Sequence, residues 1–163
     1  MAATSGRTQS PVKRLLNELQ TYHSEPNEAL DRLGPVNDDE LMHWTAVLRG
    51  VPGTPYEDGR WLLDIQIPNN YPLAPPTVTF TTPICHPNVH FRTGEICLDT
   101  LKTAWSPALQ ISSTMTVVAQ LLQSPEPDSP LNIDIAQMER QGDWLGAESL
   151  IRYYTSTLRY EGR

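Results

Sequence analysis

Apolar residues recur at helical spacing from the eleventh position onward. Ser10 is a candidate N-cap and Pro11 suits a first helical turn, so the pattern predicts a helix that begins there and ends near residues 24–26. Five apolar residues share one face of this helix: Val12, Leu15, Leu16, Leu19 and Tyr22. Four polar or charged residues lie off that stripe: Lys13, Arg14, Glu18 and Gln20.

Alternation replaces the helical period in the middle of the chain. Segments 41–50, 60–68 and 77–82 have the composition of strands, with inward positions at Leu63 and Ile65 in the second and at Val78 and Phe80 in the third. Turn residues at 52–55 and 58–59 separate the first two, and the proline-rich segment 68–76 separates the last two. Short connections between neighbouring strands predict an antiparallel meander.

Helical spacing returns after residue 111. Segment 112–123 carries an apolar face, with Ser112 or Ser113 as its N-cap, and the proline-rich segment 124–130 predicts a stiff loop. Segments 131–142 and 143–160 then predict a short helix and a long one, the latter capped by Asp143. A helix, an antiparallel sheet and further helices indicate the α+β class.

Composition favours one globular domain, which we place at residues 10–163 behind a flexible tail at 1–9. The net charge of −7 disfavours binding to nucleic acid or to anionic membranes, and the main basic cluster is Lys13-Arg14. No apolar run reaches the roughly 20 residues that span a bilayer. The start has no apolar signal core, and two cysteines twelve positions apart do not form a disulfide framework, so we expect a cytosolic protein.

Both cysteines and two of the four histidines lie within residues 84–101. A zinc site is one interpretation, but adjacent Cys85 and His86 point in different directions and no close cysteine pair exists, so we expect no metal. A cysteine–histidine hydrolase is a second interpretation, but it needs an acidic thiol. Glu95 and Asp99 flank Cys97, and their negative charge opposes a thiolate there.

A third interpretation is that both thiols are buried structural groups. It suits Cys85, which follows a predicted strand directly. It suits Cys97 less well, because a polar run and Gly94 place that residue just beyond an irregular loop. From these features alone, a structural and a functional role for Cys97 both stay open.

Four motifs in fixed order resemble those of the ubiquitin-conjugating enzymes: YPLAPP at 71–76, HPN at 86–88, GEICLDTL at 94–101 and WSPAL at 105–109. The resemblance extends over nearly the whole chain. It implies that family's fold, with an N-terminal helix, a four-stranded antiparallel meander and C-terminal helices, and it implies no cofactor. It also implies that Cys97 accepts ubiquitin as a thioester from the ubiquitin-activating enzyme. The loop from Asn88 to Cys97, one residue longer than in the commonest members, and the tail 128–154 resemble the peroxisomal branch, above all its fungal members.

The resemblance also implies roles near the nucleophile. Asn88 would donate its amide to the oxyanion that forms when the thioester is attacked, although an Asn that only fastens loop backbone fits the same position. His86 would order its turn rather than transfer protons. Ser129 would sit at the mouth of the site, where it could orient the acceptor or be phosphorylated, or it could be a turn residue only.

Partner-binding positions follow from the same resemblance. Leu73, Pro107 and Ala108 correspond to loops that dock a RING-type ligase, with Leu73 where many members carry Phe. Lys13 and Arg14 correspond to contacts with the activating enzyme, against the alternative of a solvated helix face.

The implied function is transfer of ubiquitin, with a ligase, to the peroxisomal import receptor. A membrane-anchored peroxin would recruit the cytosolic enzyme to the peroxisomal surface, through a face away from Cys97 that involves the last two helices. Two other functions stay open: a general cytosolic enzyme that modifies lysine, and a non-catalytic ubiquitin-binding variant of the fold.

Overall fold

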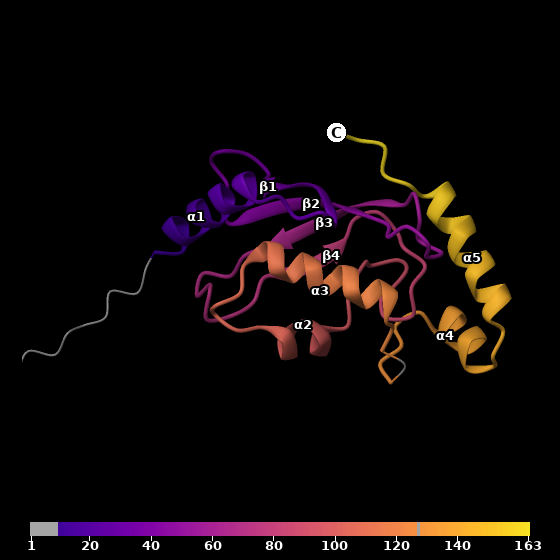
Figure 1. Cartoon of the computed structure of the whole chain (residues 1–163). Coiled ribbons are helices and arrows are strands. Elements are labelled where there is room, and N and C mark those ends of the chain that lie inside the picture. Colours follow the sequence, from indigo (N-terminus) through magenta and orange to yellow (C-terminus); the bar gives the residue numbers. More distant parts are fainter. Residues whose placement is uncertain (1–9, 127) are drawn as a thin grey trace, which may run out of the picture.

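A computed structural model describes residues 10–126 and 128–163, so the tail predicted at residues 1–9 lies outside the described part of the chain. Within these described residues, helix α1 (Pro11–Ser24) comes first, followed by four strands and then four helices (Figure 1). The strands are β1 (Leu30–Pro35), β2 (His43–Arg49), β3 (Arg60–Gln66) and β4 (Thr77–Phe80). The later helices are α2 (Leu98–Ala104), α3 (Ile111–Gln123), α4 (Ile133–Arg140) and α5 (Trp144–Thr157).

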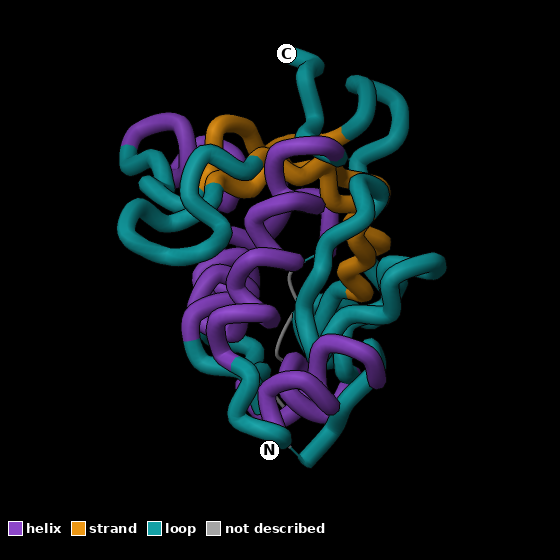
Figure 2. Tube along the Cα trace, turned by 90° about the vertical axis from the view of Figure 1, so that its right-hand side faces the viewer, coloured by secondary structure: helices purple, strands orange, loops and turns teal. Residues whose placement is uncertain are grey.

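The four strands form one antiparallel sheet in the order β1-β2-β3-β4, which confirms the expected α+β meander. Alternation in β3 places Trp61, Leu63 and Ile65 on the buried face, where none is more than 1% exposed. Helix α3 lies along that face and contributes Met115 and Val118, both fully buried (Figures 1 and 2). The core therefore lies between the sheet and α3.

Local pattern did not predict every element. Strand β1 lacks alternation and contains Gly34 and Pro35, yet it pairs with β2 along its length. Helix α2 is only seven residues long and has too few positions for a helical period to show. Helix α3 begins at Ile111, one residue before the predicted cap, and Ser113 accepts a hydrogen bond from the Gln110 N–H from inside the first turn.

Helix α1 has the predicted bounds but not the predicted faces. Leu15 is buried as expected, whereas Val12 and Leu16 are 40% and 49% exposed. Glu18, which lies off the apolar stripe, is only 4% exposed. Ser10 occupies the N-cap but its side chain makes no capping hydrogen bond. Asp143 does cap α5, because its carboxylate accepts from the Gly146 N–H at 3.0 Å.

Candidate functional site

His86 lies fully buried in the turn that follows β4. Its Nδ1 accepts a hydrogen bond from the Asn88 N–H at 3.0 Å, so the ring proton is on Nε2, which donates to the Leu121 carbonyl at 2.9 Å. Burial lowers the pKa of His86 to about 4, and the ring is neutral near pH 7. His86 thus joins the turn to α3, and neither ring nitrogen is left for proton transfer.

Asn88 is also fully buried, and its side chain reaches across to the loop after α3. Nδ2 donates to the carbonyls of Glu126 (2.7 Å) and Ser129 (3.0 Å), while Oδ1 accepts from the Glu126 N–H at 2.8 Å. Both amide hydrogens are therefore occupied. Donation to an oxyanion would require one of these bonds to be exchanged.

Ser129 is half-buried in that loop, and the neighbouring Asp128 is exposed. Beyond it, the N–H groups of Leu131 and Asn132 both donate to the Pro87 carbonyl, at 2.8 and 3.0 Å. The loop is thus fastened to the 86–88 turn on both sides of Ser129. These bonds bring three of the predicted residues together, namely His86, Asn88 and Ser129.

Cys97 adjoins this group and occupies the N-cap position of α2. Its backbone N–H donates to the Asn88 carbonyl at 3.1 Å, and Val89 forms a bridge with Ile96 just before it. Gly94 makes the preceding turn possible, because its φ is +73° and a Cβ there would lie 1.9 Å from the Phe80 carbonyl oxygen. These contacts fix the backbone at Cys97. The residue itself is partly exposed, so the site can be reached from solvent.

Cys85 differs from Cys97 in both access and acidity. It is only 3% exposed, and its carbonyl accepts from the Tyr56 hydroxyl at 2.9 Å. Burial, with a smaller effect of the Glu139 carboxylate, raises the pKa of the Cys85 thiol to about 12. Within residues 10–126 and 128–163, no group of three or more His, Cys, Asp or Glu side chains is placed to bind a metal ion.

Two loops carry the predicted ligase-docking residues. Leu73, between β3 and β4, is 72% exposed, and Pro107 and Ala108, between α2 and α3, are exposed too. The loops touch each other, since the Trp105 indole N–H donates to the Pro72 carbonyl at 3.0 Å. The two loops that carry these residues thus lie side by side, at the end of the molecule where α1 lies (Figure 1).

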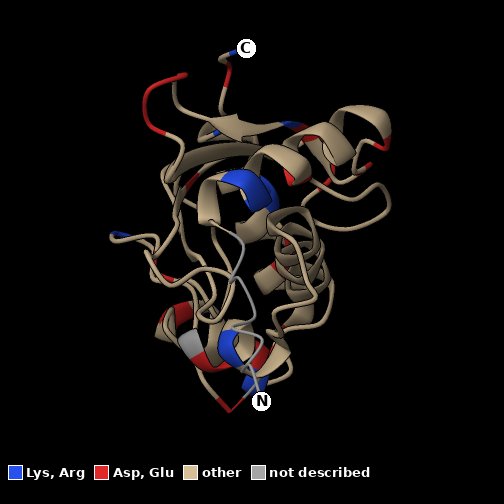
Figure 3. Cartoon of the chain, turned by 90° about the vertical axis from the view of Figure 1, so that its left-hand side faces the viewer, with Lys and Arg blue, Asp and Glu red and all other residues tan. Residues whose placement is uncertain are grey.

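Lys13 is exposed on α1. Figure 3 views the molecule from the side of α1, with Lys and Arg in blue. Arg14 is turned inward instead: its Nε lies 3.1 Å from the Glu18 carboxylate and its Nη2 donates to the Leu109 carbonyl. A pair of opposite charges four residues apart is typical of a solvated helix face, so sequence pattern could not have revealed this buried contact.

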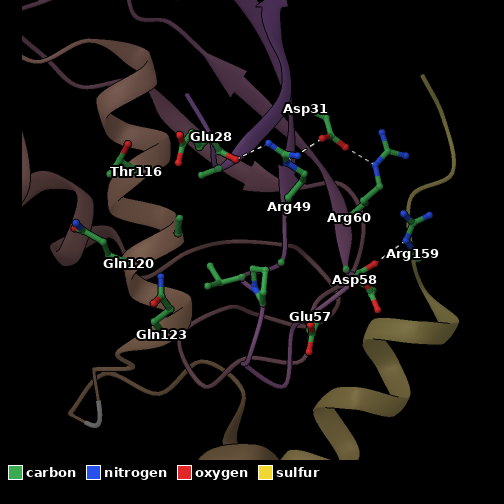
Figure 4. Close-up of a pocket in the computed structure, with 16 residues that line it drawn as sticks. Glu28, Asp31, Arg49, Glu57, Asp58, Arg60, Thr116, Gln120, Gln123 and Arg159 are labelled. Carbon is green, nitrogen blue, oxygen red and sulfur yellow. Dashed lines mark hydrogen bonds and ion pairs between the residues drawn. The ribbon is translucent and has the colours of Figure 1, made fainter. Parts of the chain in front are cut away.

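A cavity of about 960 Å³ lies elsewhere, between the β2–β3 connection, α3 and the C-terminal segment (Figure 4). Its arginines are paired within the chain. Arg49 and Arg60 both bind Asp31, and Arg159 donates to the Asp58 carbonyl. We assign it no role in the chemistry at Cys97.

Helices α4 and α5 expose large apolar side chains. Ile133 is 69% exposed, Trp144 61%, Leu145 80% and Tyr153 60%. Trp144 also borders a pocket of about 280 Å³ together with Pro87 and Pro125, so this surface reaches the 86–88 turn. No helix in the described part of the chain has both the length and the apolar character needed to cross a bilayer.

Comparison with known proteins agrees with this geometry. Residues 14–145 match the family model described as ubiquitin-conjugating enzyme. "Ubiquitin-conjugating enzyme E2 PEX4" of Gibberella zeae is 49% identical over 98% of this chain and 95% of its own length. "Protein PEROXIN-4" of Arabidopsis thaliana is 50% identical over 90% of this chain and 94% of its own.

A solved structure extends the comparison. The H. polymorpha ubiquitin-conjugating enzyme Pex4p, solved in complex with the soluble domain of Pex22p, is 36% identical and superposes with a TM-score of 0.82. The match covers 91% of this chain and 98% of that one. The chain belongs to the ubiquitin-conjugating enzyme family and is of the peroxin-4 type.

Proposed function

We propose that Cys97 carries ubiquitin as a thioester and delivers it, with a RING-type ligase, to the peroxisomal import receptor. The observation that carries this proposal is the contrast between the two thiols. Cys97 is partly exposed on a fixed backbone within the family's motif, whereas Cys85 is buried and has a raised pKa.

Charging is an exchange of thioesters. The Cys97 sulfur, as thiolate, attacks the carbonyl carbon of ubiquitin bound to the activating enzyme, and the activating enzyme's own thiolate leaves from the tetrahedral intermediate. In discharge an acceptor thiolate, or an amine that loses a proton to solvent as it adds, attacks the same carbon and the Cys97 thiolate leaves. Exchange between thiols is nearly isoenergetic, so alignment matters more than a strong base. The fixed backbone at Cys97 and the loop that Asn88 fastens supply that alignment.

The experiment is charging with activating enzyme, ATP and ubiquitin. Wild-type enzyme gives an adduct that thiol reductants cleave, and Cys97→Ser gives an oxyester that resists them, because an alkoxide leaves far less readily than a thiolate. Cys85→Ser is the matched control and still forms the reducible adduct. A folded Cys85→Ser variant that cannot be charged contradicts the single-thiol mechanism.

Recruitment to the peroxisomal membrane is proposed to come through a membrane-anchored peroxin. The complex of the H. polymorpha relative with the soluble domain of Pex22p supports a partner of this kind. The exposed apolar side chains of α4 and α5 are the proposed contacts, since exposed apolar groups favour protein binding. Replacing Leu145 and Tyr153 by Ser should weaken binding to the soluble domain of such an anchor without altering ligase-free charging. Unchanged binding would exclude this face.

The activating enzyme is proposed to contact α1 at Lys13, the exposed member of its basic pair. Lys13→Glu should slow charging, because it replaces an attractive charge at the interface by a repulsive one. The effect should shrink as salt is added. Ligase-free discharge of enzyme that is already charged should not change.

A further inference from the structure

Glu18 is a buried carboxylate that holds donors from three different parts of the chain. Oε2 accepts from the Tyr71 hydroxyl at 2.6 Å and from Arg14 Nε at 3.1 Å, and Oε1 accepts from the Ile111 N–H at 2.6 Å. A buried charge is tolerated only when it is paired and hydrogen-bonded. All three donors are therefore held at positions that Glu18 dictates.

Arg14 extends this cluster. Its guanidinium donates to the Leu109 carbonyl and lies 5.7 Å from the centre of the Tyr71 ring. The Tyr71 ring in turn lies 5.6 Å from that of Trp105. We call Arg14, Glu18 and Tyr71 the α1 brace, because they join α1 to the loop before β4 and to the loop before α3.

The attachment points of the brace lie next to the docking residues. Tyr71 comes two residues before Leu73, and Leu109 comes directly after Ala108. Leu73 and Ala108 are themselves exposed, so their positions depend on how the loops are held, by the brace and by the Trp105–Pro72 hydrogen bond. Where each loop is fastened therefore decides the separation of the two exposed docking groups.

We propose that Glu18, acting through Tyr71 and Ile111, is a positioning residue that sets the spacing of the two docking loops and so the affinity for a RING-type ligase. This rests on the ligase-driven reaction proposed above. Glu18 touches neither ubiquitin nor the reacting atoms. Its effect should appear in the concentration of ligase required and not in the chemistry at Cys97.

The spacing can be measured directly. Nitroxide labels at Leu73→Cys and Ala108→Cys, in a Cys97→Ser background, report the distance between the loops by pulsed electron resonance, while buried Cys85 stays unlabelled. Glu18→Gln keeps the shape but replaces one acceptor oxygen by an amide that cannot accept. Tyr71→Phe removes only the tie to the first loop. Both should broaden or shift the distance distribution.

The control is Ile151→Val in α5, a core truncation remote from the brace. It should lower the melting temperature while leaving the distribution narrow. If Glu18→Gln fails to fold, Tyr71→Phe, which keeps the ion pair, decides the question. If the folded Glu18→Gln and Tyr71→Phe variants give the same distance distribution as the protein with an intact brace, the proposal is wrong.

The functional readout uses a RING-domain fragment chosen because it accelerates discharge of the wild-type thioester. For Glu18→Gln the half-saturating concentration of that fragment should rise by about tenfold, the value of one hydrogen bond to a charged group. Charging and ligase-free discharge should stay at wild-type rates. An unchanged half-saturating concentration refutes the positioning role. If Cys97 cannot be charged at all, the proposed function fails, while the label distances still report on the brace.

Discussion

Replacing Asn88 by Ala removes three hydrogen bonds that fasten the 124–130 loop beside Cys97. Each is worth about 1 kcal/mol net, which sets an upper value of about 3 kcal/mol. Ser124, Pro125 and Glu126 are exposed, so water can solvate part of the released backbone. We therefore expect a loss of about 2 kcal/mol in the free energy of unfolding. For a chain of this size that lowers the melting temperature by about 4–8 °C.

Asn27 provides a matched control at a distance from the site. Its amide donates to the Ser112 carbonyl and to the hydroxyls of Ser112 and Thr116, and its Oδ1 accepts from the Ala29 N–H. Asn27→Ala should cost similar stability and leave the discharge rate unchanged. A melting temperature for Asn88→Ala within 1 °C of wild type, in the same buffer, would refute the stability estimate.

Discharge kinetics separate the two roles of Asn88. If the amide only fastens the loop, its loss misaligns the thioester for every acceptor, and discharge to free lysine and to free cysteine should slow by similar factors. If the amide also reaches the oxyanion, the lysine reaction should slow by about 10²–10³-fold and the thiol reaction by less. Because both amide hydrogens are already bound to loop carbonyls, we expect similar factors. If single-turnover assays showed discharge to lysine slowed far more than discharge to cysteine, the oxyanion role would be restored.

Three further outcomes follow from the buried groups. His86 has a pKa of about 4 in the fold, below its usual 6.5, so stability should be lost as pH falls from about 6.5 towards 4; urea unfolding of wild type and His86→Gln should show that the variant lacks this loss. Iodoacetamide should label Cys97 alone in the native protein and also Cys85 after unfolding; fast native labelling at Cys85 would contradict its burial. A chelator should leave the melting temperature unchanged, and a fall would reveal a metal site.

Sequence pattern predicted the elements whose signals are local. Alternation identified β3 and β4, helical spacing identified α1 and α3, and a single capping Asp identified the start of α5. Strand β1 was not visible in the pattern, because its strand conformation comes from pairing with β2 and not from its own residues.

The site divides in the same way. Cys97 and the 86–88 turn could be identified from contiguous motifs, and Cys85 from its apolar neighbours. The burial of Glu18 could not, because its partners Tyr71 and Ile111 lie 53 and 93 residues further along the chain. Nor could the partners of Asn88 be predicted, since Glu126 in the loop that it fastens lies 38 residues later. Long-range polar contacts carry no periodic signal.

These contacts show how the residues around Cys97 hold the site in place. His86, the buried imidazole of the adjoining 86–88 turn, has both ring nitrogens engaged and a lowered pKa, so it cannot serve as a base at neutral pH. The Asn88 amide donates both hydrogens to carbonyls of the bordering loop, and the Asn88 carbonyl accepts from the Cys97 N–H. These contacts therefore serve to hold a thioester in place, and a thioester is already reactive enough to exchange. With His86 unable to act as a base, the mechanism proposed above relies on the ligase to bring the acceptor near Cys97. On that mechanism we expect the spacing of the two predicted docking loops to affect which acceptor is modified.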